Sequence, residues 1–374
     1  MALVFMDGFD HYSSTQAECS AEMLNSGKYQ KAGNIYINAR DDIPYPDGIG
    51  RSLYFDDVYG LDGRAETKTF TITGNKIIIG FHIYSTNYNF NYFGDFGYPL
   101  ALSTGGGTTI FSFSSNSDLG EFYWMLGGVS PDPSLANPKL SNTLINCPQG
   151  TWVHIGIEVD LATDATGRAK LFVNGNEVAD EQNIQTATAL DGTFKLKLGF
   201  SNDDACTGDF HLDNLVVMDG SGTKHNAFPG VMRILPLKPT STAETGAGMT
   251  SSSGSDPYLD VDDTGLSDST ADWVSSATTG ERMLYGIEDA ATVWPDIQSV
   301  LAVEVVQHVG TDAPDFSVVR NVINDGTNTV ESDDANVTAV APRPVTDQFV
   351  DAPDGGDWNL AKLQALKIGH KHQG

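Results

Sequence analysis

The chain has 374 residues, which predicts two or three domains at roughly 150 residues each. Its 49 acidic and 21 basic residues give a formal net charge of −28, which argues against binding to nucleic acid or docking on anionic membranes. The 40% of apolar residues is enough for packed cores, and the 39 glycines fit many short strands joined by tight turns.

The first residues give no sign of a targeting segment. Met1–Asp7 has no basic region and its apolar stretch ends at Asp7, so we expect no signal peptide. No run approaches the roughly 18 apolar residues of a membrane-spanning helix. Cys19, Cys147 and Cys206 are far apart and form no CxxC pair, which favours idle thiols over a disulfide framework or a zinc site.

Residues 1–228 are predicted to form strands and turns throughout. Period-two alternation, typical of antiparallel strands with one buried face, occurs at 69–73, 152–159 and 194–198. The continuous apolar run at 76–81 predicts a central strand that is covered on both sides. Asn174-Gly175 between two β-like runs predicts a tight hairpin, because a type I′ turn needs positive φ at both central residues.

The composition changes near residue 229. The segment 229–255, rich in Thr, Ser, Gly and Ala, is predicted to be an ordered linker that lies against a domain surface or a neighbouring subunit. Residues 256–374 resume with apolar strands, of which 299–306 and 316–323 are the clearest.

The last residues carry a helical pattern. Asp357 stands at an N-cap position, Leu360, Leu363 and Leu366 follow at helical spacing, and Gly369 can cap the C-terminus. We therefore predict one short helix over 358–368. His370-Lys371-His372 then follows it, and a frayed or contact-making terminus is the expected state, with stray metal binding as the alternative.

Three segments of the first part resemble the laminin G-like, concanavalin A-like jelly roll. They are the opening Phe5–Asp10, the tryptophan strand and hairpin from Trp152 to Gly175, and the closing Phe210–Asp219. The resemblance implies an all-β fold with a concanavalin A-like jelly-roll sandwich over 1–228. A second, smaller β-rich domain with the short C-terminal helix is expected over 256–374.

The second part resembles a domain that follows such jelly rolls in structural proteins of tailed bacteriophages. The matching residues are Gly230–Thr240, Val261–Asp263, Asp272–Val274, Leu284-Tyr285 and Asp357–Leu360 with Leu363, Leu366 and Gly369. This resemblance implies a virion structural protein, assembled in the host cytoplasm, with copies of itself and major capsid or tail proteins as partners.

Catalytic carboxylates are a candidate on the strand that ends at Asp160. Jelly-roll glycoside hydrolases carry Glu-x-Asp-x-x-Glu on one strand, which places carboxylates on one face of the sheet. Glu158 and Asp160 fit the first two positions, but the third is Thr163. We therefore expect polar residues of an amphipathic strand and no enzymatic activity.

Three short segments are candidates for a metal or phosphate site. Asp260, Asp262 and the neighbouring acidic residues suggest a calcium loop, but Ala271 stands where an EF-hand loop has its bidentate Glu, so a solvated acidic turn is expected. Asn202-Asp203-Asp204 with Asp209, near the closing strand, is another candidate cation site. Gly105-Gly106-Gly107 lacks the Lys-Ser/Thr of a phosphate loop and is predicted to be a turn. No resident cofactor is expected, with calcium as the alternative.

The densest cluster of aromatic residues lies between Phe81 and Tyr98. Such a cluster is typical of a glycan-stacking or protein-docking surface, or of a strand followed by a loop that covers its own sandwich. The candidate interface or glycan-contact residues are Tyr84, Tyr88, Tyr92, Phe93, Phe96 and Tyr98.

Two functions remain open on the sequence. The first is a virion structural protein, with a capsid decoration role expected because no coiled coil or fibre repeat is present. The alternative is a tail or baseplate component that binds carbohydrate for host recognition, since the same fold supports both.

Overall fold

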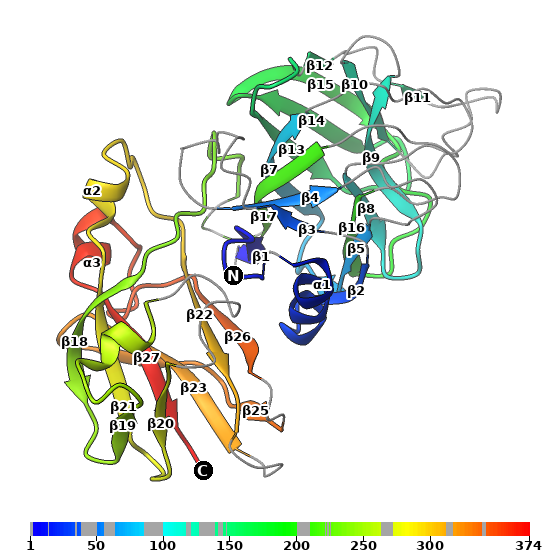
Figure 1. Cartoon of the computed structure of the whole chain (residues 1–374). Helices are drawn as coiled ribbons and strands as arrows, with labels where there is room; N and C mark the ends of the chain where they lie inside the picture. The colour runs from blue at the N-terminus through cyan, green and yellow to red at the C-terminus, as the bar shows by residue number, and fades with distance from the viewer. Residues whose placement is uncertain are drawn as a thin grey trace. The chain divides into compact units, whose positions relative to one another are not determined.

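The structure is a computed structural model. It describes residues 3–13, 15–33, 36–38, 51–55, 64–85, 100–116, 121–126, 139–140, 145–146, 148–199, 210–220, 222, 224, 226–262, 272–311, 317–338 and 342–374. The chain forms two compact units (Figure 1). Unit 1 comprises Met1–Phe9 and Ser14–Ile234, and unit 2 comprises Asp10–Ser13 and Leu235–Gly374.

Unit 1 is a jelly-roll sandwich of two large antiparallel sheets, as predicted. Sheet A contains, in spatial order, β15 (Asn176–Ile184), β14 (Gly167–Val173), β13 (Val153–Asp160), β7 (Lys76–Ser85), β17 (Phe210–Asp219), β4 (Ser52–Phe55) and β3 (Tyr36–Asn38), with β1 (Leu3–Asp7) paired to β17. Sheet B contains β11 (Lys139–Leu140), β10 (Glu121–Leu126), β9 (Thr109–Asn116), β8 (Leu100–Thr104), β16 (Thr193–Gly199), β5 (Arg64–Thr67) and β2 (Tyr29–Gly33), with β12 (Ile145–Asn146) on β10 and β6 (Phe70–Thr71) on β16.

The burial of residues along β16 and β7 agrees with the strands that the sequence predicted in unit 1. In β16, Phe194, Leu196 and Leu198 are buried, while the lysines between them are half-buried. β7 is buried along nearly its whole length, as its continuous apolar run predicted. At the β14–β15 hairpin, Asn174 and Gly175 both have positive φ, 49° and 81°, which is the geometry of the predicted turn.

The N-terminal strand closes sheet A by pairing with the last strand of the jelly roll. Its Asp7 is fully buried and accepts hydrogen bonds from the Phe9 N–H and the Tyr29 hydroxyl, each at 2.9 Å. Lys28 lies 3.8 Å from the same carboxylate. The opening and closing segments that carried the jelly-roll resemblance therefore lie side by side.

Helix α1 (Gln16–Asn25) corrects the expectation that residues 1–228 hold only strands and turns. Cys19 and Met23, four residues apart, are buried on one helix face. Thr15 and Glu18 have the Ser/Thr-x-x-Glu spacing of a capping box, but the Thr15 hydroxyl donates to the Glu18 carboxylate at 2.5 Å and makes no side-chain cap hydrogen bond to the helix backbone. Among the cysteines, Cys147 and Cys206 lie outside the described residues.

Unit 2 is smaller and also β-rich. Sheet C contains, in spatial order, β18 (Pro239–Thr245), β21 (Arg282–Ile287), β27 (Lys367–His372), β23 (Ser317–Asn324) and β24 (Thr329–Glu331), with β25 (Ala335–Val337) on β23. Two ribbons accompany it: β19 (Met249–Ser251) with β20 (Val274–Ser276), and β22 (Val303–Val309) with β26 (Arg343–Phe349). Its helices are short: η1 (Pro257–Asp260), α2 (Ala290–Val293) and α3 (Leu360–Gln364).

The core of unit 2 gathers around Trp358. The indole N–H donates to the Phe349 carbonyl oxygen at 2.8 Å, and Leu363 and Leu366 pack into the same cluster. The helical spacing of these leucines was predicted, but the helix ends at Gln364 and begins after an Asn359 cap rather than at Asp357.

The C-terminal residues correct a second expectation. His370-Lys371-His372 is not a frayed tail, because it belongs to β27, the central strand of sheet C. Gly369 lies within that strand and caps no helix, and a Cβ there would lie 1.9 Å from the Met283 carbonyl oxygen. The segment 229–255, expected as a linker, also contains two strands, β18 and β19. No helix of the described residues is long and apolar enough to cross a membrane.

Candidate functional site

The outer face of sheet A carries an unusual set of residues on two adjacent strands. Gly80 of β7 lies opposite Gly156 of β13, and His82 lies opposite His154 one step along. Their inward-facing neighbours are buried Ile and Phe residues. Two glycines side by side inside strands leave a shallow trough, since no side chain stands above the backbone there.

The segment Phe228–Ile234, here called the strap, lies in this trough. A Cβ on Gly156 would lie 2.2 Å from Cε2 of Phe228, and a Cβ on Gly80 would lie 2.1 Å from Cε of Met232. The Phe228 ring also stacks on Phe172, with 4.3 Å between centroids and 22° between planes. The glycines are therefore required by the close approach of the strap.

Three side chains of sheet A accept hydrogen bonds from the backbone of the strap. Glu158 Oε2 accepts from the Phe228 N–H at 3.1 Å, and His154 Nε2 accepts from the Met232 N–H at 3.2 Å. Asn214 Oδ1 accepts from the Ile234 N–H at 2.5 Å. The strap is thus fixed along its length by polar contacts and by aromatic packing.

The two histidines beneath the strap are almost completely buried, with 2% of His82 and 1% of His154 exposed. Burial, together with the Arg233 guanidinium, lowers the pKa of His154 to about 3. Burial, then His154 and Arg233, hold the pKa of His82 well below its usual range. Both rings are therefore neutral at physiological pH.

A second group of rings lies farther along the same face. Tyr84 is 5.3 Å from Trp152 and 5.8 Å from His211 between ring centroids, and Tyr54 stacks on His211 at 4.6 Å. Tyr84 was predicted as an interface or glycan-contact residue, and it lies in β7 with 8% of its surface exposed. The other predicted contact residues, Tyr88, Tyr92, Phe93, Phe96 and Tyr98, lie outside the described residues.

Glu158 and Asp160 share the outer face of β13, as the strand period requires. Lys76 Nζ lies 2.8 Å from Glu158 and 3.5 Å from Asp160. Glu158 thus pairs with Lys76 and also accepts a hydrogen bond from the strap, through the Phe228 N–H.

Two of the candidate metal residues, Asp260 and Asp262, are described by the structure. Asp260 is buried at 3% exposure at the end of η1, where it accepts from the Ser251 hydroxyl. Asp262 is half-buried, and Asp203 lies outside the described residues. Among the described residues no group of three or more His, Cys, Asp or Glu side chains could hold a metal ion. Gly105 and Gly106 form the turn between β8 and β9, as predicted.

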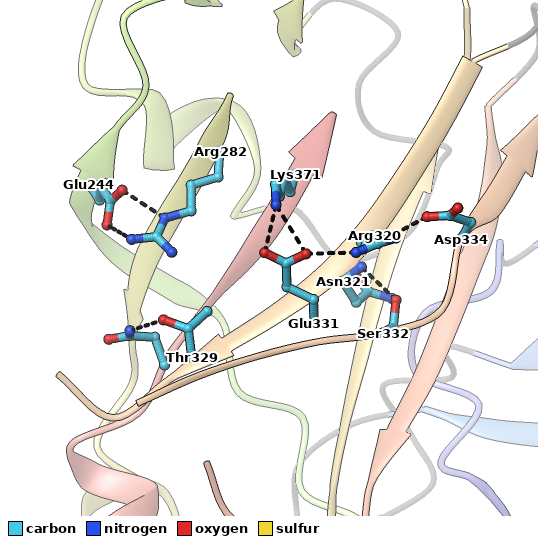
Figure 2. Close-up of polar contacts among 10 residues, drawn as sticks. Glu244, Arg282, Arg320, Asn321, Thr329, Glu331, Ser332, Asp334 and Lys371 are labelled. Atoms are coloured by element: carbon cyan, nitrogen blue, oxygen red, sulfur yellow. Dashed lines mark hydrogen bonds and ion pairs between the residues drawn. The ribbon is translucent and has the colours of Figure 1, made fainter. Parts of the chain in front are cut away.

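Unit 2 carries a row of charges that was not predicted. Arg282 and Arg320 each pair in register with Lys371, so three cations stand side by side on β21, β27 and β23 (Figure 2). The carboxylates of Glu244, Glu331 and Asp334 hold these cations. We call these six residues the charged stripe.

The ion pairs of the charged stripe are close. Arg282 binds Glu244 through two hydrogen bonds of 2.7 and 2.8 Å. Glu331 accepts from Lys371 at 2.8 Å and from Arg320 at 2.9 Å, which keeps the pKa of Glu331 below its ordinary value. Part of the stripe borders an open hollow of about 230 Å³ lined by Glu244, Gly246, Gly280, Glu281, Arg282, Glu331 and Lys371.

The pattern of the stripe is hidden in the sequence because its members come from five separate segments. Arg282, Arg320 and Lys371 are isolated basic residues among strand residues. Only the pairing of β21, β27 and β23 brings them into register. A prediction of residues 367–372 as a strand would have indicated that Lys371 can lie beside other strand residues.

Comparison with known proteins gives likeness in fold only. No protein-family model and no curated protein matches the sequence. The chain is similar to an alginate lyase from Aplysia kurodai at 11% identity, covering 59% of this chain and 98% of that one with a TM-score of 0.40. It is similar to an endo-β-1,4-glucuronan lyase from Trichoderma reesei at 13% identity, covering 51% and 89% with a TM-score of 0.34.

A third similar structure is a carbohydrate esterase of the Shiga toxin-encoding bacteriophage phi24B, at 10% identity, covering 57% of this chain and 99% of that one with a TM-score of 0.35. These β-rich jelly-roll structures are enzymes. The jelly-roll fold therefore gives no ground for expecting that the chain is not an enzyme, and that prediction is wrong. The absence of a carboxylate at Thr163 excludes only the Glu-x-Asp-x-x-Glu motif of jelly-roll glycoside hydrolases.

Proposed function

We propose that this chain is a structural protein of a tailed-bacteriophage virion that attaches to its partner proteins through the charged stripe of unit 2. A capsid decoration role is the first form of this proposal, and a tail or baseplate position is the other. The resemblance of residues 230–240 and 357–369 to domains of such proteins supports it.

The arrangement of the charged stripe is the observation that carries the proposal. Three cations in register on adjacent strands repel one another unless carboxylates lie beside them, and ion pairs at a protein surface add little to stability, typically about 0–1 kcal/mol each. Stability alone therefore does not account for the stripe. A fixed pattern of both charge signs does suit a partner surface of complementary pattern, where it selects the partner and its register.

Binding to virions tests the proposal. The purified chain is mixed with particles that lack it and sedimented with them, and cryo-electron microscopy locates it on the capsid or the tail. Arg282→Glu should weaken binding about tenfold or more, which corresponds to about 1.4 kcal/mol. Arg168→Glu is the matched control, because Arg168 makes the same two-bond pair with Asp180 in unit 1.

Equal binding by the wild type, Arg282→Glu and Arg168→Glu would contradict attachment through the charged stripe. Absence of the chain from virions whose genome encodes it would contradict the structural role altogether.

Trp273 supports the second candidate function, carbohydrate binding for host recognition. Half of its surface is exposed next to the β19–β20 ribbon, and its backbone exchanges two hydrogen bonds of 2.9 Å with Ser252. An exposed indole beside hydroxyl groups suits stacking on a sugar ring. Host polysaccharide should quench the fluorescence of the wild type but not of Trp273→Phe, and unchanged fluorescence of the wild type would contradict this role.

A further inference from the structure

We propose that the strap over sheet A is an acid-released latch: proton uptake by His82 and His154 opens the segment Phe228–Ile234 while the jelly roll beneath it stays folded. This inference does not depend on the proposed function. It rests on the hydrogen bond between the His154 side chain and the Met232 backbone N–H, and on the burial of the histidine pair.

The hydrogen bond between the strap and His154 fixes the proton on the ring. The Met232 backbone N–H can only donate, so Nε2 of His154 must accept at 3.2 Å and carries no proton. The single proton of the neutral ring is then on Nδ1. A second proton on Nε2 would place two donors against each other, so the protonated ring cannot keep this bond.

The burial of His82 and His154 is a second reason why proton uptake is unfavourable while the strap is closed. Nδ1 of His82 and Nδ1 of His154 are both buried and have no hydrogen-bond partner among the described residues. The rings contact each other edge to face, with 4.7 Å between centroids. On His154 neither nitrogen therefore faces an acceptor, because Nδ1 has no partner and Nε2 faces the Met232 N–H.

The charged groups around the pair come from four segments. On the strap, Arg233 opposes protonation of both rings. On β17, Asp213 lies opposite His82, and its carboxylate accepts from the Asn214 N–H at 2.6 Å. On β13, Glu158 is engaged by Lys76 of β7 and by the Phe228 N–H. On β17, His211 lies one step beyond Asp213, with its Nδ1 2.9 Å from the Ser52 hydroxyl.

Burial first, and then the neighbouring basic groups, lower the pKa of both histidines in the closed state. An opened strap exposes the rings to water, where a histidine titrates near pH 6.5. Because the open state binds more protons, the equilibrium constant for opening rises as the pH falls below about 6.5, by up to about tenfold per pH unit for each histidine. The rise ends only when the closed state itself takes up protons, near pH 3 for His154.

Contacts that do not titrate keep the latch closed at neutral pH. Phe228 fills the space over Gly156, and Met232 fills the space over Gly80. Burial of these two apolar side chains stabilises the closed strap, and this contribution does not change with pH.

Methionine oxidation by hydrogen peroxide on the full-length protein measures the opening directly. Met232 is 4% exposed, and its reaction followed by peptide mass spectrometry should speed up about tenfold or more between pH 7 and pH 5. Met23 in α1, fully buried in the same unit, should stay protected over this range. The range lies above the pH at which ordinary carboxylates titrate.

His154→Gln tests the mechanism, since glutamine can still accept from the Met232 N–H but takes up no proton. Its slope of log rate against pH should fall by about one unit per pH unit. His308→Gln is the matched control, because His308 is a half-buried histidine of unit 2 whose pKa is also lowered, and it should keep the wild-type slope. Hydrogen exchange at the histidine Cε1 position of the wild type reports the two pKa values if the His154 variant does not fold.

Three results would overturn the latch. The first is Met232 oxidation in the wild type that does not change between pH 7 and pH 5. The second is an unchanged slope in His154→Gln. The third is oxidation of Met23 together with Met232, which would mean that unit 1 unfolds as a whole.

Discussion

Gly156 and Gly80 show how single residues decide what can cover a sheet. Both lie inside strands, where glycine lacks a side chain to pack and lowers strand preference. The two glycines allow Phe228 and Met232 to pack against the backbone, in the space that a Cβ would occupy. Two glycines in register on adjacent strands thus indicate that another segment packs closely on that face of the sheet.

Replacing Gly156 by alanine should destabilise unit 1 by about 1–3 kcal/mol, because the added methyl group overlaps the Phe228 ring and moves the strap. Urea unfolding monitored by circular dichroism measures this loss. Gly106→Ala in the exposed β8–β9 turn is the control and should change stability by less than about 0.5 kcal/mol. An equal effect of the two substitutions would show that the strap does not press on Gly156.

Two histidines of unit 2 should make its stability depend on pH. Burial lowers the pKa of His308 and of His370 to about 4. The unfolded chain therefore binds more protons than the folded one between about pH 4 and 6.5, and stability falls as the pH falls through this window. The loss is at most about 1.4 kcal/mol per pH unit for each histidine.

Thermal unfolding of the full chain between pH 7.5 and 5 checks this expectation. His308→Gln and His370→Gln should each flatten the pH dependence of the unit 2 transition. Tyr285→Phe, which removes no group that titrates in this range, should leave the slope as it is. Asp347 works in the opposite sense, since burial raises its pKa, but only toward the acid end of the range.

At the scale of elements, Glu331 joins two strands of sheet C electrostatically. It accepts hydrogen bonds from both Lys371 of β27 and Arg320 of β23. Glu331→Gln leaves three cations side by side and should cost about 1 kcal/mol at low salt. Added salt should shrink this cost by screening the repulsion. Urea unfolding at two salt concentrations measures it, and Asp334→Asn, which touches only Arg320, should cost less.

The C-terminal strand β27 should be essential for unit 2. It lies between β21 and β23, so removing residues 367–374 breaks two ladders at once. Calorimetry should then show the transition of unit 1 without that of unit 2. Removing Gly374 alone deletes one backbone hydrogen bond, to the Val318 N–H, and should retain both transitions. Two transitions in the longer deletion would contradict the central place of β27.

Helix and strand signals overlap at this end of the chain, which explains the difference from the predicted helix over 358–368. The spacing of Leu360, Leu363 and Leu366 fits a helix, and α3 forms there. It ends at Gln364 because the following residues pair with β21 and β23. That pairing is not local, so the sequence pattern gives no sign of it. Helix α1 was missed although Thr15 and Glu18 carry a local capping signal.

At the scale of the whole molecule, the strap sets the effective end of the jelly roll. Unit 1 ends at Ile234 rather than at residue 228, because Met232 and Ile234 are bound to sheet A. A fragment 1–234 should therefore be more stable than 1–228 by about 2 kcal/mol, the order of burying one methionine side chain. Both fragments lose the rest of unit 2, in which Asp10–Ser13 lie, so their difference isolates residues 229–234 of the strap. Equal denaturation midpoints would contradict this boundary.

The sequence by itself determined those features that depend on neighbours along the chain. Alternation in 152–159 and 194–198 defined half-buried strands, and Asn174-Gly175 defined the hairpin between β14 and β15, because side-chain period and turn geometry are local properties. Tertiary structure alone decided the roles of residues whose partners are distant. Gly156, His154 and Glu158 acquire their contacts only when the strap crosses sheet A, and Lys371 meets Arg282 and Arg320 only when β27 enters sheet C. Such contacts join segments far apart in the chain, and no local pattern specifies which segment will arrive.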